Sequence, residues 1–333
     1  REVREGSLFV AIRGERADGH DFLSQVAAAG AAAVAVDHEV ASDLPQIIVP
    51  DTRLAMAWLA REAHGRPDEH LSIVGVTGTN GKTTVVHMCE AVWRSVGAAA
   101  GIVGTLGARY GSTPLPLART TPESSDLQRL LGTMVESGIE HVAMEVSSHA
   151  LDLHRADAIH FDTVGFTNLS QDHLDFHRDM ESYFASKAKL FSEGRADAAV
   201  IDVSSEAGVR MADVAHMPVM ATSTSGDADL RATDLHATAV GTSFTLRFEG
   251  ATAESSIPLV GDFNVSNALV AAGLLLTDGM ALDRVAEGLT TLEPIPGRME
   301  AVPNDLGFAV VVDYAHTPDA VSTVLASVRS SVD

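Results

Sequence analysis

A glycine-rich turn joins a strongly apolar segment to a segment with helical periodicity, and this arrangement limits the folds open to the chain. The apolar segment is Ser72–Thr77, the turn reads Gly78-Thr79-Asn80-Gly81, and the expected helix is Lys82–Val96. Glycines let a backbone curl so that its N–H groups point inward, and a helix N-terminus adds partial positive charge. The segment therefore predicts a phosphate-binding loop between a strand and a helix.

The end of this turn carries the side chains that such a loop needs. Lys82 can reach the outer phosphates of a nucleotide, and the hydroxyl of Thr83 or Thr84 can bind Mg²⁺. The strict pattern G-x-x-x-x-G-K-[ST] is not met, because Val76 stands where the first glycine belongs and Gly75 is one position early. An ordinary glycine-rich turn is the alternative, but it gives no reason for Lys82. We therefore predict that phosphates contact Gly78, Thr79, Asn80, Gly81, Lys82, Thr83 and Thr84.

Strand-like and helical segments alternate from Leu71 onwards, which is typical of a doubly wound, largely parallel sheet. The expected strands are Ser72–Thr77, Ala98–Val103, His141–Val146, Thr163–Thr167 and Ala198–Val203, and the expected helices between them are Lys82–Val96, Pro122–Ser137 and Met180–Phe191. Antiparallel strands are expected over Ala232–Glu249 and Glu254–Leu259, followed by helices near Asn264–Leu276 and Asp283–Leu292.

Two glycine- and proline-rich segments, Gly65–Asp68 and Pro294–Gly297, predict domain boundaries. Residues 1–70 are expected to form a small α/β domain, residues 71–297 the central phosphate-loop domain, and residues 298–333 the start of a Rossmann-like third domain. The expected elements of the first domain are strands Leu8–Ile12, Ala33–Val36 and Gln46–Val49, a helix near Asp21–Ala29, and a helix from Asp51 to His64. The third domain is expected to open with strand Ala309–Asp313 and helix Pro318–Val332. The first residue is not Met and the last helix has no C-cap signal, so we expect a chain shortened at both ends.

The charge balance excludes several classes of partner. Lys and Arg total 23 whereas Asp and Glu total 45, so the formal net charge is −22. Phosphate backbones and anionic membranes attract basic surfaces, so neither nucleic acid nor a membrane surface is an expected partner. The single cysteine, Cys89, excludes an internal disulfide and a cysteine-based zinc cluster. With no apolar run of membrane-spanning length and no signal-peptide pattern, a cytoplasmic protein is expected.

Polar residues follow two of the expected strands at the edge where ligands bind in doubly wound sheets. Glu145 ends the strand His141–Val146 and is suited to Mg²⁺ or a metal-bound water, although it could instead accept hydrogen bonds from the N–H groups of Ser147 or Ser148. His173 and His177 follow another strand, with a spacing that also permits a zinc hydrolase. No Glu follows His173 as it does in the H-E-x-x-H pattern of zinc hydrolases, which counts against that alternative.

Lys187 lies on the face of a helix that should point inward. Within Met180–Phe191 the apolar residues recur with helical spacing, and Lys187 shares their face whereas Lys189 does not. An inward lysine must extend to solvent, pair with an acid, lose its proton or be modified. A neutral amine reacts with CO₂ to give a carbamate, whose oxygens suit Mg²⁺.

Taken together, these residues resemble those of the Mur ligases, the family of UDP-N-acetylmuramoyl-peptide ligases, and the resemblance extends over essentially the whole chain. The matching motifs are Leu8–Ala11, Asp18–Phe22, Thr77–Thr84, Thr120–Pro122, Met144–Leu151, Asn168–His177, Gly261–Ala268, Gly297–Glu300 and Asp313–Ala320. Within the family, the chain most resembles the branch that adds the third amino acid of the peptide.

The resemblance implies a first domain that binds the UDP end of the substrate, a central domain that binds ATP, and a third domain that brings the amino acid. It also implies a role for each matching residue. Lys82, Glu145, His173 and carbamylated Lys187 would be catalytic. Thr83, Glu145, His173 and Lys187 would hold Mg²⁺ at two positions, Asn267 would contact adenine, and Arg298 and Asp313 would contact phosphate and ribose. Thr120, Thr121, Ser147 and Arg155 would contact the UDP-muramoyl-dipeptide.

The activity implied is ATP-dependent addition of meso-diaminopimelate or L-lysine to UDP-N-acetylmuramoyl-L-alanyl-D-glutamate through an acyl phosphate. This reaction serves peptidoglycan synthesis and hence cell-wall growth, cell shape and division. The motif that selects the amino acid is expected beyond residue 333, so the chain alone is expected to ligate poorly, and a monomer is expected. A folylpolyglutamate synthetase-like ligase and a nucleotide-binding switch without ligase chemistry are the alternatives.

Overall fold

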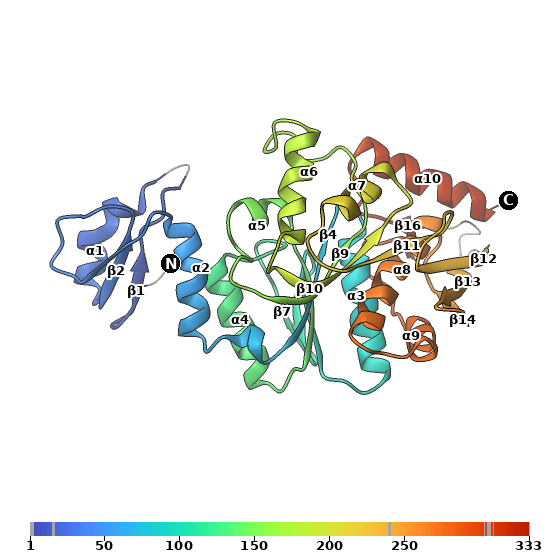
Figure 1. Cartoon of the computed structure of the whole chain (residues 1–333), viewed down its shortest axis with the longest axis horizontal. Coiled ribbons are helices and arrows are strands. Elements are labelled where there is room, and N and C mark those ends of the chain that lie inside the picture. Colours follow the sequence, from blue (N-terminus) through green and yellow to red (C-terminus); the bar gives the residue numbers. More distant parts are fainter. Residues whose placement is uncertain are drawn as a thin grey trace.

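The computed structural model describes residues 3–14, 17–238, 241–302, 304, 308 and 310–332. These residues form a three-stranded, an eleven-stranded and a two-stranded sheet. In Figure 1 the small sheet stands at one end of the molecule, and the large sheet with its helices makes up the bulk. The fold is therefore α/β, as the sequence predicts.

The small sheet is parallel and lies near the N-terminus. Its strands are β1 (Leu8–Val10), β2 (Ala33–Val36) and β3 (Gln46–Ile48) in that order, and η1 (Gly19–Phe22) and α1 (Leu23–Ala28) connect β1 to β2. The expected helix Asp21–Ala29 thus begins with a 3₁₀ turn. Among the described residues, the buried apolar core of this unit consists of Ala11, Leu23, Val26, Ala31, Val34 and Val36.

Helix α2 (Thr52–Ala63) links the small sheet to the rest of the chain, as Figure 1 shows. It begins at Asp51, whose carboxylate accepts hydrogen bonds from the N–H groups of Arg53 and Leu54. Such a cap satisfies N–H groups that have no partner within the helix. The helix packs against α4 (Ser124–Glu136), and the short η2 (Pro67–Glu69) leads into the large sheet.

The large sheet has a parallel centre with antiparallel edges, in the order β14-β13-β12-β11-β10-β9-β4-β8-β5-β6-β7. Its parallel strands are β4 (Ser72–Thr77), β5 (Ala100–Gly104), β8 (His141–Glu145), β9 (Phe161–Phe166), β10 (Ala196–Asp202), β11 (Val219–Ser223) and β12 (Leu230–Thr238). The antiparallel strands are β6 (Gly107–Tyr110), β7 (Thr113–Leu115), β13 (Gly241–Phe248) and β14 (Ala251–Ile257).

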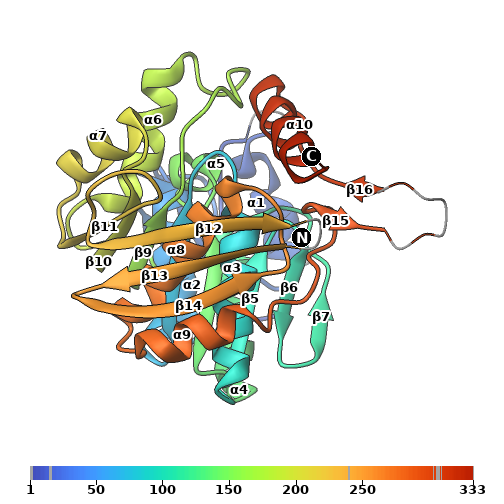
Figure 2. The same ribbon diagram turned by 90° about the vertical axis from the view of Figure 1, so that its right-hand side faces the viewer.

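Helices cover both faces of this sheet. One apolar cluster packs α3 (Lys82–Ser95), α8 (Asp262–Thr277) and α9 (Leu282–Leu289) against the sheet, and the other packs α4 and α6 (Met180–Ala188) against it. Neighbouring residues of β4 enter opposite clusters, Val74 the first and Ile73 the second. This alternation is the signature of a strand buried on both faces. Figure 2 shows α3 and α8 behind β12, β13 and β14, and α9 below β14.

Several elements differ from those expected. Ala232–Glu249 is divided between β12 and β13 rather than forming one strand. The division was not predicted, because no Asn-Gly or Asp-Gly pair stands between the two strands in the sequence. Met180–Phe191 ends as a helix at Ala188 and continues as η3 (Lys189–Phe191). The hairpin β6–β7, the helices α5 (Ser148–Asp152) and α7 (Glu206–Val214), and β11 were not anticipated.

The last segment forms β15 (Glu300–Ala301), β16 (Val311–Val312) and α10 (Pro318–Val332). The first residue of the expected strand Ala309–Asp313 lies outside the described residues. In Figure 2, β15 and β16 extend away from the body of the molecule, whereas α10 lies beside that body. Within the described ranges, none of the helices combines the length and apolarity that crossing a membrane requires.

Candidate functional site

The turn between β4 and α3 adopts a backbone conformation that only glycine tolerates at two positions. Gly78 has φ +146° and Gly81 has φ +88°. A Cβ atom on Gly78 would lie 2.0 Å from Oγ1 of Thr167, and one on Gly81 would lie 2.1 Å from Oδ1 of Asn267. Asn168 supports the turn, because its backbone and side-chain oxygens accept from the N–H groups of Thr79 and Asn80, each at 2.9 Å.

Lys82 folds back over the same turn. Its Nζ donates hydrogen bonds to the carbonyl oxygens of Gly78 and Thr79, each at 2.8 Å. Desolvation lowers the pKa of Lys82, whereas the carboxylate of Glu145 raises it. The cation is thus held against the loop, where it faces any anion bound there.

Glu145 lies at the carboxyl end of β8 and is 1% exposed. Its Oε1 accepts from Oγ1 of Thr83 at 2.9 Å and from the N–H of Thr105 at 2.8 Å, and its Oε2 accepts from Oγ1 of Thr105 at 3.0 Å. The alternative partners weighed from the sequence, the N–H groups of Ser147 and Ser148, are not the ones that the structure shows. A carboxylate beside a threonine hydroxyl is the oxygen donor set that Mg²⁺ prefers.

Lys187 on α6 points into the protein. Its side chain is 1% exposed, and its Nζ donates to the carbonyl oxygen of Gly78 at 2.8 Å. The amine lies 4.3 Å from the centre of the Tyr183 ring. Desolvation, reinforced by the nearby charge of Lys82, holds the pKa of Lys187 well below its usual range. Burial thus favours the neutral form of the amine, which is directed at the phosphate loop.

The structure gives the side chains of His173 and His177 different surroundings. His173 lines a cavity together with Lys82, Thr83 and Glu145, whereas Nε2 of His177 is 2.8 Å from Oγ of Ser148 in the interior. In the described part of the chain, no third His, Cys, Asp or Glu joins these two histidines as a metal ligand. The zinc-hydrolase alternative therefore has no ligand set at this place.

A second cavity adjoins the first and contains Asn267, Arg298 and Asp313. Arg298 lines both cavities, and its Nη2 donates to Oγ1 of Thr83 at 2.8 Å. Its buried Nε has no hydrogen-bond partner within the described ranges. Buried donors are normally paired, so this atom fits a bound anion. The carboxylate of Asp313 accepts from the N–H groups of Met299 and Ala315, each at 2.8 Å.

The four residues assigned to the muramoyl substrate form one network beside Glu145. Thr120 and Ser147 line the first cavity. Thr121 and Arg155 are buried behind them. The hydroxyl of Thr121 donates to the carbonyl oxygen of Glu145 at 2.8 Å, and Nη1 of Arg155 donates to the carbonyl oxygen of Thr121 at 3.4 Å. Thr121 and Arg155 are thus arranged to position the cavity wall.

Four residues of the first cavity were not singled out from the sequence: Thr105, Asp172, Tyr314 and His316. The first two follow the carboxyl ends of parallel strands, Thr105 after β5 and Asp172 six residues after β9. The rule that located Glu145 could therefore have found Thr105 as well. Thr105 takes part in holding Glu145, and Asp172 raises the pKa of the neighbouring His173, although burial lowers it more.

The loop, the cation, the acid at a strand end and the adjoining cavity define a nucleotide-binding enzyme of the doubly wound class. Two protein-family models match the chain: the Mur ligase middle domain over residues 76–275 and the Mur ligase family catalytic domain over residues 1–64. A UDP-N-acetylmuramoyl-L-alanyl-D-glutamate–2,6-diaminopimelate ligase from Geobacillus kaustophilus (strain HTA426) is 41% identical over 336 residues, 99% of this chain and 69% of that protein. The chain therefore belongs to the Mur ligase family and is an ATP-dependent ligase.

Solved structures agree with this family. A structure of a UDP-N-acetylmuramoyl-L-alanyl-D-glutamate–2,6-diaminopimelate ligase is similar with a TM-score of 0.87 and 29% identity, covering 99% of this chain and 68% of that chain. Folylpolyglutamate synthase from Mycobacterium tuberculosis, complexed with ADP and AMPPCP, has a TM-score of 0.70 at 18% identity, covering 84% of this chain and 71% of that chain. At that identity the second likeness shows the shared fold alone.

Proposed function

We propose that this chain provides the nucleotide site of a ligase that joins 2,6-diaminopimelate to UDP-N-acetylmuramoyl-L-alanyl-D-glutamate at the expense of ATP. The convergence of Lys82, Thr83, Glu145 and Arg298 on one cavity carries this proposal. The adjoining cavity offers room for the nucleoside. The names of relatives at about two fifths identity supply the substrate and favour diaminopimelate over L-lysine.

We further propose that the three sheets correspond to three functional parts. Residues 1–70 would bind the UDP end of the substrate, residues 71–297 would bind ATP, and residues 298–333 would begin the part that brings the amino acid. The separate sheets and the short connecting segments support this division. The proposed compartment is the cytoplasm, where ATP is available, and the proposed active form is a monomer.

The donors around Glu145 fit Mg²⁺. The hydroxyl of Thr83 and the carboxylate of Glu145 would hold one ion, which neutralises charge on the phosphates when bound. His173 and a carbamate on Lys187 would serve a second position. Carbamate formation joins the lysine nitrogen to the carbon of CO₂ and releases one proton, and the product is an anion. The carbamate nitrogen would keep one N–H for the carbonyl oxygen of Gly78, which also accepts from Lys82.

The residues of the cavity then account for the chemistry. A carboxylate is a poor acyl donor, and transfer of the outer phosphate of ATP to one of its oxygens releases ADP and makes that oxygen part of a phosphate leaving group. Lys82 and Arg298 would stabilise the negative charge during this transfer. The amine of the incoming amino acid attacks the acyl phosphate, and the tetrahedral intermediate collapses to amide and phosphate. Asn267 would contact adenine, Asp313 would contact ribose, and Thr120 and Ser147 would contact the muramoyl peptide, positioned by Thr121 and Arg155.

Release of inorganic phosphate tests this function. It is measured in a protein that spans the full length of the relatives. We expect release to require both the UDP-muramoyl-dipeptide and diaminopimelate, and to fall at least 100-fold in Glu145→Gln. Glu140→Gln, at an exposed glutamate, is the matched control. Turnover with L-lysine instead would correct the amino acid, turnover with a folate would favour the folylpolyglutamate alternative, and nucleotide hydrolysis without either substrate would indicate a switch.

A further inference from the structure

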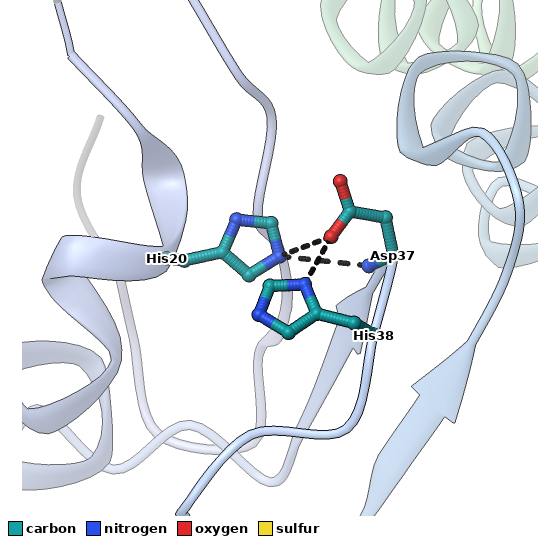
Figure 3. Close-up of side chains that lie close together, drawn as sticks. All are labelled: His20, Asp37 and His38. Carbon is teal, nitrogen blue, oxygen red and sulfur yellow. Dashed lines mark hydrogen bonds and ion pairs between the residues drawn. The ribbon is translucent and has the colours of Figure 1, made fainter.

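Two histidines and an aspartate meet in the small N-terminal unit, far along the chain from the nucleotide cavities. Asp37 and His38 directly follow β2, and His20 lies in η1. One potential ligand atom from each lies within 4.8 Å of the other two. In Figure 3 the rings of His20 and His38 both turn a nitrogen toward the same carboxylate oxygen of Asp37.

The hydrogen bonds of His20 differ between its two ring nitrogens. Its Nδ1 lies 2.6 Å from Oδ1 of Asp18, so this nitrogen carries a proton that the carboxylate accepts. Its Nε2 accepts, at 3.5 Å, from the backbone N–H of Asp37 and lies 3.2 Å from Oδ1 of Asp37. With this proton on Nδ1, Nε2 is the nitrogen that would face a metal ion bound beside Oδ1 of Asp37.

The spacing of the ligand atoms also suits a tetrahedral metal ion. Zinc bonds of about 2.0–2.1 Å in a tetrahedron place neighbouring ligand atoms about 3.3 Å apart. The 3.2 Å between Nε2 of His20 and Oδ1 of Asp37 matches this edge. Nδ1 of His38 lies 2.5 Å from the same oxygen, so its ring must turn outward by roughly 1 Å. The His38 side chain is 54% exposed, which leaves room for this turn.

Two charged neighbours complete the arrangement. Nε of Arg13 pairs with Oδ2 of Asp37 at 2.8 Å, which leaves Oδ1 for the metal. Nη2 of Arg13 also donates to Oδ1 at 3.2 Å, and metal binding would break this contact. Asp18 plays the part that a carboxylate plays behind a metal-binding histidine, because it fixes the tautomer and the orientation of the ring.

We propose that His20, Asp37 and His38 bind a divalent transition metal of the zinc class, with the fourth position open to water or a ligand. The ion would tie η1 to the end of β2. Few apolar residues are buried in the core of this unit, and small units with little core commonly depend on such cross-links. Asp18 is a positioning residue in this site. The site takes N and O ligands together, unlike the two oxygen donors, Thr83 and Glu145, proposed for the first Mg²⁺ position.

Co²⁺ binding tests the site directly. The protein is freed of metal with a chelator, kept in excess Mg²⁺ to fill the oxygen site, and titrated with Co²⁺, whose visible absorption reports four-coordinate N/O ligation. We expect one equivalent to bind and Zn²⁺ to displace it. His38→Gln should weaken binding at least 100-fold, and Asp18→Asn by roughly 10–100-fold. His70→Gln, at an exposed histidine outside the cluster, should leave binding unchanged.

Thermal unfolding gives an independent readout. Zn²⁺ should raise the melting temperature of the wild type and not that of His38→Gln, whereas the two should melt alike without metal because His38 is largely exposed. Equal Co²⁺ affinity in the wild type and His38→Gln would overturn the proposal and leave a hydrogen-bonded cluster only. Loss of the Co²⁺ spectrum in His173→Gln, but not in His38→Gln, would overturn it too, because the metal would then lie in the phosphate cavity.

Discussion

Replacing Lys187 by Met separates two roles that its position allows. The amine either supports the phosphate loop through its hydrogen bond to Gly78 or becomes a carbamate that serves a metal ion. Met keeps a side chain of similar shape as far as Cε, with sulfur in place of Cδ, and removes the amine. Lys189→Met is the matched control, because Lys189 is two residues away, exposed, and paired with Asp152 at 2.6 Å.

The two roles predict effects of different size. A single net hydrogen bond contributes about 1 kcal/mol, or roughly a fivefold change, and the carbonyl oxygen of Gly78 keeps Lys82 as a donor at 2.8 Å. Loss of a group that stabilises charge at the reacting phosphate lowers kcat by about 10²–10³. The carbamate role therefore predicts a decrease of at least 100-fold in ligation for Lys187→Met.

Unfolding would not explain such a loss. The pKa of Lys187 is well below its usual range in the folded protein, because burial disfavours the charged amine. The unfolded chain therefore binds this proton more tightly than the folded chain does, and this difference lowers the stability of the wild type at pH values below the usual lysine pKa. Lys187→Met removes that penalty, so its free energy of unfolding at pH 7 should equal or exceed that of the wild type.

The assay compares ligation, ADP binding and the response to bicarbonate in the wild type and both variants. We expect ADP affinity to change less than fivefold, since Lys187 lines neither cavity. Added bicarbonate should raise the activity of CO₂-depleted wild type and of Lys189→Met, and leave Lys187→Met unchanged. A decrease of fivefold or less in Lys187→Met, or no response of the wild type to bicarbonate, would refute the carbamate role.

Three further substitutions follow from contacts in the structure. Gly104→Ala should weaken Mg²⁺-dependent ATP binding about tenfold, because the new Cβ would lie 2.2 Å from Oε1 of Glu145 and displace that carboxylate. Calorimetry with and without Mg²⁺ measures this effect. Gly81→Ala should weaken ADP binding more than tenfold even without Mg²⁺, since the new Cβ meets Asn267 and φ is +88°. Burial lowers the pKa of His87 to about 4 from 6.5, so the wild type should lose stability as the pH falls from 6.5 toward 4. The loss of unfolding free energy should reach about 3 kcal/mol. Denaturant titrations at each pH should show a weaker pH dependence of stability in His87→Gln than in the wild type. An equally strong pH dependence in His87→Gln would show that His87 is not its cause.

Local patterns in the sequence were sufficient to predict the parts of the site that belong to one element. Glycines before Lys82 predicted the loop, because only glycine adopts its backbone angles. The apolar strand before Glu145 predicted an acid at a strand end, and helical periodicity predicted that Lys187 would face inward, where the structure buries it. In each case, the chemistry of neighbouring residues restricts the backbone or the orientation of the side chain.

Partnerships between distant residues required the tertiary structure. Arg298 lies 215 residues from Thr83 in the chain and yet donates a hydrogen bond to its hydroxyl, and Thr105 holds Glu145 across 40 residues. The metal cluster of His20 and Asp37 depends in the same way on the parallel pairing of β1 with β2. Sequence patterns report local backbone preferences and burial, whereas these contacts depend on how strands pair and helices pack. The sequence by itself therefore determined the kind of loop, the phosphate chemistry and the fold class, and packing of the sheets decided which side chains meet.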